Sequence, residues 1–234
     1  MNELERVEAA ALRDAVVLAG GRAALVGGAL CVAHDEIPIR ELNRVMPIGD
    51  SLDLDAIRPW YGHASHMIAT TLQLDERGYR PGTPWQKFER DAAPAPEAAT
   101  DLAVAETIDA DGFGRVAAEG SGLPPETAPL LARVVGAPGW HCFLASAAGE
   151  PAAAGALYVD GTSAWLGIAA TRAAFRRRGA QSALLAARID AARAAGAKLL
   201  TTETGTGEPG PSYRNIERAG FRAAYVRPNW LSPA

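Results

Sequence analysis

Residues 175–182 read FRRRGAQS and separate two segments of different character. The preceding residues 163–170 (SAWLGIAA) form an apolar run that predicts a buried strand. The following residues 182–195 (SALLAARIDAARAA) are strong helix formers with an apolar stripe at Leu184, Leu185 and Ile189. We therefore expect the loop to open an amphipathic helix directly after a strand.

A helix that starts at this loop would provide a phosphate site. Its first N–H groups have no partner within the helix, and they lie at the positive end of the helix dipole. Gly179 lets the backbone approach an anion closely, and Arg176, Arg177 and Arg178 add positive charge. A basic helix start whose charges are only solvated is the alternative interpretation.

The loop resembles the acyl-CoA pyrophosphate loop of the GNAT superfamily of N-acetyltransferases, whose pattern is Arg/Gln-x-x-Gly-x-Gly/Ala. Arg176 stands in the first position and Gly179 in the fourth, but Gln181 takes the sixth, where Gly or Ala is usual. The longer side chain must point away from the pyrophosphate or make a polar contact with it. The resemblance implies acetyl-CoA as co-substrate, with its pyrophosphate held by Arg176, Arg177, Arg178, Gly179, Ala180, Gln181 and Ser182.

The segments around the loop follow the order of elements in that superfamily. Their patterns predict strands at residues 102–108, 141–146, 152–159, 164–170 and 198–204, and helices at 110–120, 125–136 and 211–219. Residues 212–221 (SYRNIERAGF) resemble the superfamily's late helix-to-strand junction, where Gly220 closes the helix and Phe221 starts a strand. The expected fold class is α/β (α+β), with residues 99–234 forming a GNAT acyl-CoA N-acyltransferase domain, a mixed and mostly antiparallel sheet flanked by helices.

Residues 1–98 predict a smaller N-terminal α/β domain. It contains a helix at 4–18, an apolar run at 23–33, a strand at 41–47, a helix at 52–61 and a strand-like segment at 67–72. Residues 76–80 (ERGYR) echo residues 217–222 (ERAGFR), so we hypothesise a degenerate copy of part of the same fold, without the Arg-x-x-Gly-x-Gly loop. Residues 92–99 (AAPAPEAA) predict a semi-rigid linker between the two domains. A cleft between the domains would suit the acceptor.

Composition and charge argue against a nucleic-acid-binding protein and against a membrane-spanning one. The formal net charge of −4 gives no reason to expect a nucleic-acid partner, and no apolar run approaches the roughly 20 residues of a membrane span. We expect a cytoplasmic protein, because no secretory signal is visible. Cys31 and Cys142 lie far apart and predict buried thiols, while His63 and His66 lack a third ligand, so no metal site is expected. The oligomeric state stays open, with a homodimer as one option.

Residues 205–210 (GTGEPG) spell a second phosphate motif, Gly-x-Gly-x-x-Gly. A dinucleotide site needs an acidic residue downstream for the ribose, and none follows Glu217. A P-loop needs a lysine where Pro211 stands. We therefore expect no nucleotide there.

The resemblance also implies the chemistry, which is direct attack of an amine on the thioester of acetyl-CoA. By the pattern of the superfamily, Ala169, Ala170 and Thr171 would bind the pantetheine arm, and Asn215 would bind the pantetheine or the helix start. Backbone groups would polarise the carbonyl, and side chains would move protons.

The tyrosine that often protonates the leaving thiolate is replaced here by Ile216. Ser212 and Tyr213 are the candidate donors, with helix capping and aromatic packing as their alternative roles. Glu203 is the candidate base, with an exposed edge-strand carboxylate as the alternative. The predicted function is N-acetylation of a small-molecule or protein amine; the alternative is a non-catalytic acyl-CoA-binding regulatory domain.

Overall fold

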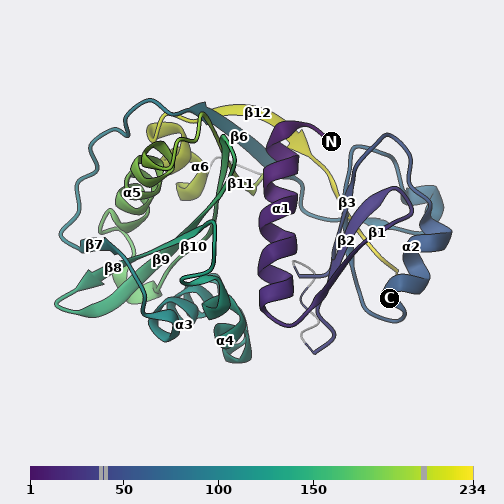
Figure 1. Ribbon diagram of the computed structural model, residues 1–234, viewed down its shortest axis with the longest axis horizontal. Helices are drawn as coiled ribbons and strands as arrows, with labels where there is room; N and C mark the ends of the chain where they lie inside the picture. The colour runs from purple at the N-terminus through teal and green to yellow at the C-terminus, as the bar shows by residue number, and fades with distance from the viewer. Residues whose placement is uncertain (37–38, 40–41, 207–209, 234) are drawn as a thin grey trace.

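Two mixed sheets, each covered by helices, form the computed structural model, which describes residues 1–36, 39, 42–206 and 210–233 (Figure 1). The first part of the chain contributes α1 (Glu3–Leu18), β1 (Arg22–Val26), β2 (Ala29–Ala33), β3 (Arg44–Pro47), α2 (Leu54–Tyr61), β4 (Met67–Ala69), β5 (Arg80–Pro81) and β6 (Trp85–Asp91). The second contributes β7 (Ala103–Glu106), α3 (Ala110–Ser121), α4 (Ala128–Leu131), β8 (Trp140–Ala147), β9 (Glu150–Asp160), β10 (Ser163–Thr171), α5 (Ala180–Ala194), β11 (Leu199–Gly205), α6 (Pro211–Arg218), β12 (Arg222–Arg227) and β13 (Asn229–Leu231). Short 3₁₀ turns lie at Asp75–Arg77, Pro125–Thr127, Ala132–Val134 and Ala173–Phe175.

The two sheets exchange strands. The first has the order β1-β2-β3-β4-β13-β5, and the second has the order β12-β6-β11-β10-β9-β8-β7. The last strand of the chain therefore lies in the N-terminal sheet, and β6 lies between β11 and β12 of the C-terminal sheet. The predicted linker at residues 92–99 follows β6, so hydrogen bonds join the two halves in both directions across it. A division at residue 98 stays a prediction about domain organisation.

The secondary structure predicted after residue 100 agrees with the structure at nearly every element. Residues 125–136 are a difference, because short 3₁₀ and α-helical turns replace the single predicted helix. A proline within the first two residues of α4 cannot donate a helical hydrogen bond, so a new turn begins there. The predictions did not include β6 and β13.

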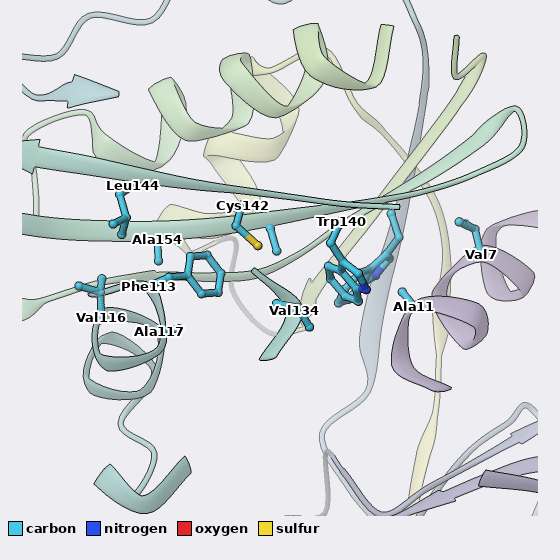
Figure 2. Close-up of a cluster of buried hydrophobic side chains, with 12 residues drawn as sticks. Val7, Ala11, Phe113, Val116, Ala117, Val134, Trp140, Cys142, Leu144 and Ala154 are labelled. Carbon is cyan, nitrogen blue, oxygen red and sulfur yellow. The ribbon is translucent and has the colours of Figure 1, made fainter. Parts of the chain in front are cut away.

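Helix α1 stands between the two sheets (Figure 1). Asn2 caps its start by accepting a hydrogen bond from the N–H of Glu5, at 3.0 Å. Val7 and Ala11 are fully buried against the C-terminal half, where they join a cluster with residues of α3, β8, β9 and β10 (Figure 2). The opposite side of α1 packs on β1 and β2. The helix thus fixes one half against the other.

None of the helices in the described residues has the length and apolar character needed to span a bilayer.

Candidate active site

A cavity of about 1130 Å³ opens between the two halves. Its lining residues come from α1, β3 and β6 in the first part of the chain, and from α3, α4, β10, α5, β11 and α6 in the second. The lining is largely apolar, as is typical of small-molecule sites. Each predicted site residue can be placed relative to this cavity.

The start of α5 lies at one end of the cavity. Its N-cap residue, Gly179, has φ of +79° and offers no side chain to the free N–H groups. A Cβ at this position would lie 2.1 Å from the carbonyl oxygen of Ala99, so only glycine fits. Ala180, Gln181 and Ser182 also line the cavity. The helix start therefore has no capping side chain, and its binding of an external anion stays a prediction.

The three loop arginines separate into two groups. Arg176 and Arg177 are exposed and line the cavity, and Arg177 has a left-handed φ of +66°. Arg178 does not line it, because its guanidinium is paired with Asp101. That hydrogen bond raises the pKa of Arg178 and lowers the pKa of the Asp101 carboxyl. The structure thus uses Arg178 to fix the loop to the segment before β7.

Gln181, the departure from the loop pattern, points back to β10. Its amide nitrogen donates to the carbonyl oxygen of Ala170 at 3.0 Å and to Oγ1 of Thr171 at 2.9 Å. The longer side chain therefore joins the first turn of α5 to the strand. Ala170 is one of the residues predicted to bind the pantetheine arm, and its carbonyl oxygen already has a partner in Gln181, whereas Ala169 is exposed beside it.

Strand β10 separates from β11 at the middle of the cavity. Their parallel pairing covers Ser163↔Leu199 to Trp165↔Thr201 and goes no further. On the other side, the register with β9 shifts between Gly167 and Ala170, and Ile168 has φ of +47°. A β-branched residue rarely adopts this conformation, and such strain often marks functional sites. No periodicity or turn signal in residues 163–170 predicts this bulge.

Glu203 lies where β11 borders the cavity, and among the described lining residues it is the one carboxylate. Its side chain is 9% exposed, and its Oε2 lies 2.5 Å from Nζ of Lys87 on β6. Trp165 donates its indole N–H to both carboxylate oxygens at 3.2 Å. The carboxylate is thus held at the cavity wall, which excludes the alternative of an exposed surface glutamate.

Lys87 also joins Glu203 to a buried group of charges around Glu8 of α1. Glu8 is fully buried and accepts from Lys87 at 2.9 Å, from Arg44 at 2.8 Å and from Arg227 at 2.6 Å. Burial raises the pKa of the Glu8 carboxyl, but Arg227, Lys87 and Arg44 outweigh it and hold that pKa well below its usual range. These residues come from α1, β3, β6 and β12, so the group joins both sheets.

Helix α6 carries the remaining predicted residues. Ser212 and Asn215 line the cavity at spacing i, i+3, together with Ile216. Tyr213 lies on another face of the helix, where its ring packs edge-on against Phe88 at 5.0 Å between ring centroids. The structure therefore does not bring Tyr213 to the cavity, because α6 begins at Pro211 and turns it toward the core. Ser212 is the predicted hydroxyl that reaches the site.

The histidines considered as metal ligands are not among the residues that line this cavity. His66 is buried, stacks on Tyr61 at 4.2 Å between ring centroids, and lies 2.9 Å from the hydroxyl of Tyr79. In the described part of the chain, no group of three or more His, Cys, Asp or Glu side chains could hold a metal ion. The second glycine motif falls partly on residues 207–209, which lie outside the described residues.

Comparisons with known proteins identify the fold. No family model matches the sequence, and no curated protein matches it. Among solved structures, the GCN5-related N-acetyltransferase from Kribbella flavida aligns with a TM-score of 0.66 at 17% identity, over 100% of this chain and 97% of that one.

The GCN5-related N-acetyltransferase from Sphaerobacter thermophilus has a TM-score of 0.61 at 15% identity, over 72% of this chain and 59% of that protein's own length. A tandem GNAT protein from the clavulanic acid biosynthesis pathway has a TM-score of 0.55 at 16% identity, over 89% and 80% of the two chains. The fold expected from residues 175–182 is thus confirmed, and the chain has the fold of the GCN5-related N-acetyltransferases.

Proposed function

We propose that this protein transfers an acetyl group from acetyl-CoA to a primary amine by direct attack on the thioester. One observation carries the proposal. A single cavity runs from the open start of α5, along the unpaired edge of β10, to the carboxylate of Glu203. It therefore joins an anion site to a proton acceptor.

Each part of the cavity suits one part of the donor. The first N–H groups of α5 and the guanidinium groups of Arg176 and Arg177 bind the pyrophosphate. Ala169 and Thr171 on β10, with Asn215 on α6, bind the pantetheine amides. The acyl end then lies between Gly167 and Glu203.

The acceptor enters from the wall that the N-terminal half provides. Leu12, Ala15 and Trp85 make much of this wall apolar, which favours an amine with an apolar body. Either a small molecule or a protein side chain meets this description. Glu203 accepts the proton of the attacking nitrogen, and the hydroxyl of Ser212 passes a proton to the leaving thiolate as water replaces its own.

Calorimetric titration with acetyl-CoA tests the donor site. A hydrogen bond to a charged group contributes about 1.5–3 kcal/mol, so Arg176→Ala and Arg177→Ala should each weaken acetyl-CoA binding about tenfold or more. Arg193→Ala is the matched control, because Arg193 is exposed near the other end of α5 and should leave the affinity unchanged. Failure of the folded wild-type protein to bind acetyl-CoA would contradict the proposal.

Release of free thiol during incubation with a panel of primary amines tests the transfer. General-base catalysis contributes roughly 10²–10⁴-fold, so Glu203→Gln should lower kcat by about a hundredfold while acetyl-CoA still binds. A second candidate function, a non-catalytic acyl-CoA-binding regulatory domain, is favoured by the position of Tyr213 and by the ion pair between Glu203 and Lys87. Binding without thiol release for any amine would select it.

A further inference from the structure

Arg188 of α5 is a buried cation without a carboxylate partner among the described residues. Its side chain is 1% exposed, yet it borders the cavity. Nε donates to the oxygen of Leu184 at 3.0 Å, and Nη1 donates to the oxygens of Ala156 and Gly167 at 3.2 and 3.3 Å. Burial lowers the pKa of the guanidinium to about 10, which leaves it charged at neutral pH. Burying a charge without an oppositely charged partner costs free energy, which indicates that Arg188 has a role beyond packing.

The guanidinium lies beneath the bulge of β10. The register with β9 passes from Gly167↔Ala156 to Ala170↔Ala154, which leaves Gly155 facing the two bulged residues. A Cβ on Gly155 would lie 3.0 Å from both Cζ and Nε of Arg188, so this glycine makes room for the group. Ile168, with its strained φ of +47°, sits in the same bulge. Arg188 binds the carbonyl oxygens that the irregular pairing presents.

We propose that Arg188 is a positioning residue for acyl transfer, which holds the β10 bulge and polarises the peptide between Gly167 and Ile168 toward the thioester. This inference rests on the proposed function. The Gly167 oxygen that accepts from Arg188 belongs to the same peptide as the N–H of Ile168, and a hydrogen bond from a cation makes that N–H a stronger donor. Both residues border the cavity at the expected acyl end. Positive charge behind this peptide stabilises the negative charge that builds on the thioester oxygen.

The test follows the thioester carbonyl itself. Infrared difference spectra of bound acetyl-CoA, labelled with ¹³C at the carbonyl, would be recorded with wild type, Arg188→Lys, Arg188→Met and Gly155→Ala, together with kcat and KM. We expect the wild type to lower the carbonyl stretching frequency relative to water. Arg188→Met and Gly155→Ala should reverse this shift and lower kcat about tenfold, with a smaller change in KM, because electrostatic groups act mainly on the transition state. Arg188→Lys keeps the charge and should fall between them.

Two controls separate polarisation from general damage. Arg193→Met removes an exposed arginine of the same helix, and Gly49→Ala adds a methyl group where no atom lies within 4 Å. Neither should change the spectrum or kcat. If Arg188→Met does not fold, Gly155→Ala and Arg188→Lys decide the question by the same readouts.

The outcomes distinguish the two proposals. A wild-type carbonyl frequency and kcat in folded Arg188→Met would overturn the role of Arg188 and leave acyl transfer standing. A wild type that binds acetyl-CoA but acetylates no amine would overturn the proposed function and the role of Arg188 in acyl transfer, and the infrared shift would then test only whether Arg188 polarises the bound thioester. A wild type that does not bind acetyl-CoA would overturn both.

Discussion

The two sheets repeat one order of strands. In the N-terminal half, three antiparallel strands β1, β2 and β3 lead through α2 to a parallel β4, followed by β13 and β5. In the C-terminal half, β8, β9 and β10 lead through α5 to a parallel β11, followed by β6 and β12. In each sheet, the strand after the parallel pair comes from the other half. That residues 1–98 hold a degenerate copy of the fold stays a prediction, and this repeated order is the observation that supports it.

The equivalent helices α2 and α5 begin in opposite ways. At α2, the carboxylate of Asp53 accepts from the N–H groups of Asp55 and Ala56 at 3.0 and 3.2 Å, and Asp55 adds further negative charge. At α5, Gly179 provides no capping side chain, and two arginines lie nearby. The same position in the fold is thus open to an anion only at α5, where the chain leaves the helix start without a capping side chain. Substitutions at the two helix starts and at the contacts that join the halves test this difference, and the largest effect is expected at Glu8.

Glu8→Gln should destabilise the protein most, because Glu8 holds three buried cations from both halves. Breaking a buried ion pair costs about 3–5 kcal/mol, so the free energy of unfolding in urea should fall by that amount. The control Glu217→Gln changes an exposed carboxylate of α6 and should stay within about 0.5 kcal/mol of wild type. A loss below about 1 kcal/mol for Glu8→Gln would show that the charges do not hold the halves together.

The same carboxylate should limit acid stability. The pKa of Glu8 is lowered in the folded protein, so its contribution is complete above its ordinary value of 4.5 and is lost as pH falls through the lower folded pKa. Thermal unfolding measured from pH 7 downward should show Tm decreasing below about pH 4.5. In Glu8→Gln this decrease should be smaller, and an identical acid profile would contradict the assignment.

Gly179→Ala should weaken acetyl-CoA binding and lower stability more than Gly196→Ala. Both glycines have a left-handed φ, at +79° and +86°, but the added methyl group meets the Ala99 oxygen at position 179 and nothing within 4 Å at position 196. The left-handed conformation costs an alanine about 1–2 kcal/mol at either site, and the clash adds to this at position 179 only. Chemical denaturation and calorimetry measure the two effects. Equal losses of stability and of acetyl-CoA affinity in the two variants would contradict the requirement for glycine at position 179.

Ser182→Asp should make the start of α5 resemble that of α2. A carboxylate in the first turn stabilises a helix by about 0.3–1 kcal/mol, yet it would repel the pyrophosphate and weaken acetyl-CoA binding about tenfold. The side chain in Ser182→Asn has nearly the shape of aspartate without its charge, so this variant separates charge repulsion from steric bulk. Unchanged affinity in Ser182→Asp would place the phosphate elsewhere.

Asp53→Ala removes the capping carboxylate from the start of α2, which makes this helix start resemble that of α5. Loss of this N-cap should cost about 1 kcal/mol of stability and leave acetyl-CoA binding unchanged. Denaturation and calorimetry on one preparation check both expectations. A change in donor affinity would mean that α2 takes part in the donor site.

The thiols of Cys31 and Cys142 should react with an alkylating reagent in the same way. Burial raises the pKa of Cys31 in the N-terminal half to about 11 and that of Cys142 in the C-terminal half to about 12, so both should resist alkylation in the folded protein. Because the sheets exchange strands, we expect both thiols to become reactive at one urea concentration. Pulsed alkylation with mass spectrometry reads each cysteine separately, and two distinct midpoints would show that the halves unfold independently.

The sequence predicted most of the C-terminal half, because local signals determine its elements. Apolar periodicity gave the strands and α5, and Gly179 and Gly220 marked helix ends through a conformation that other residues avoid. Strand β6 was missed because Lys87 and Arg90 do not suggest a buried strand. Their burial depends on Glu8, Glu203 and the oxygen of Ala219, which are distant in the sequence.

The sequence predicted only those parts of the candidate site that depend on where a residue stands in its own strand or helix. Glu203, Ser212 and the start of α5 line the cavity, and their roles there stay predictions. Tyr213 does not, although the i, i+3 spacing of Ser212 and Asn215 on α6 could have indicated which face looks inward. The role proposed for Arg188 depends on a bulge formed between two strands, which periodicity does not reveal.

The exchange of β13 also sets the order in which the protein can fold during synthesis. Residues 229–231 lie between β4 and β5, so the N-terminal sheet cannot close until the ribosome has synthesised these residues. Until then, Met67–Ala69 presents an unpaired strand edge, which is a site for wrong pairing between chains. Because β4 pairs with a strand more than 150 residues away in the sequence, this edge stays open for longer than it would if its partner were a neighbouring segment.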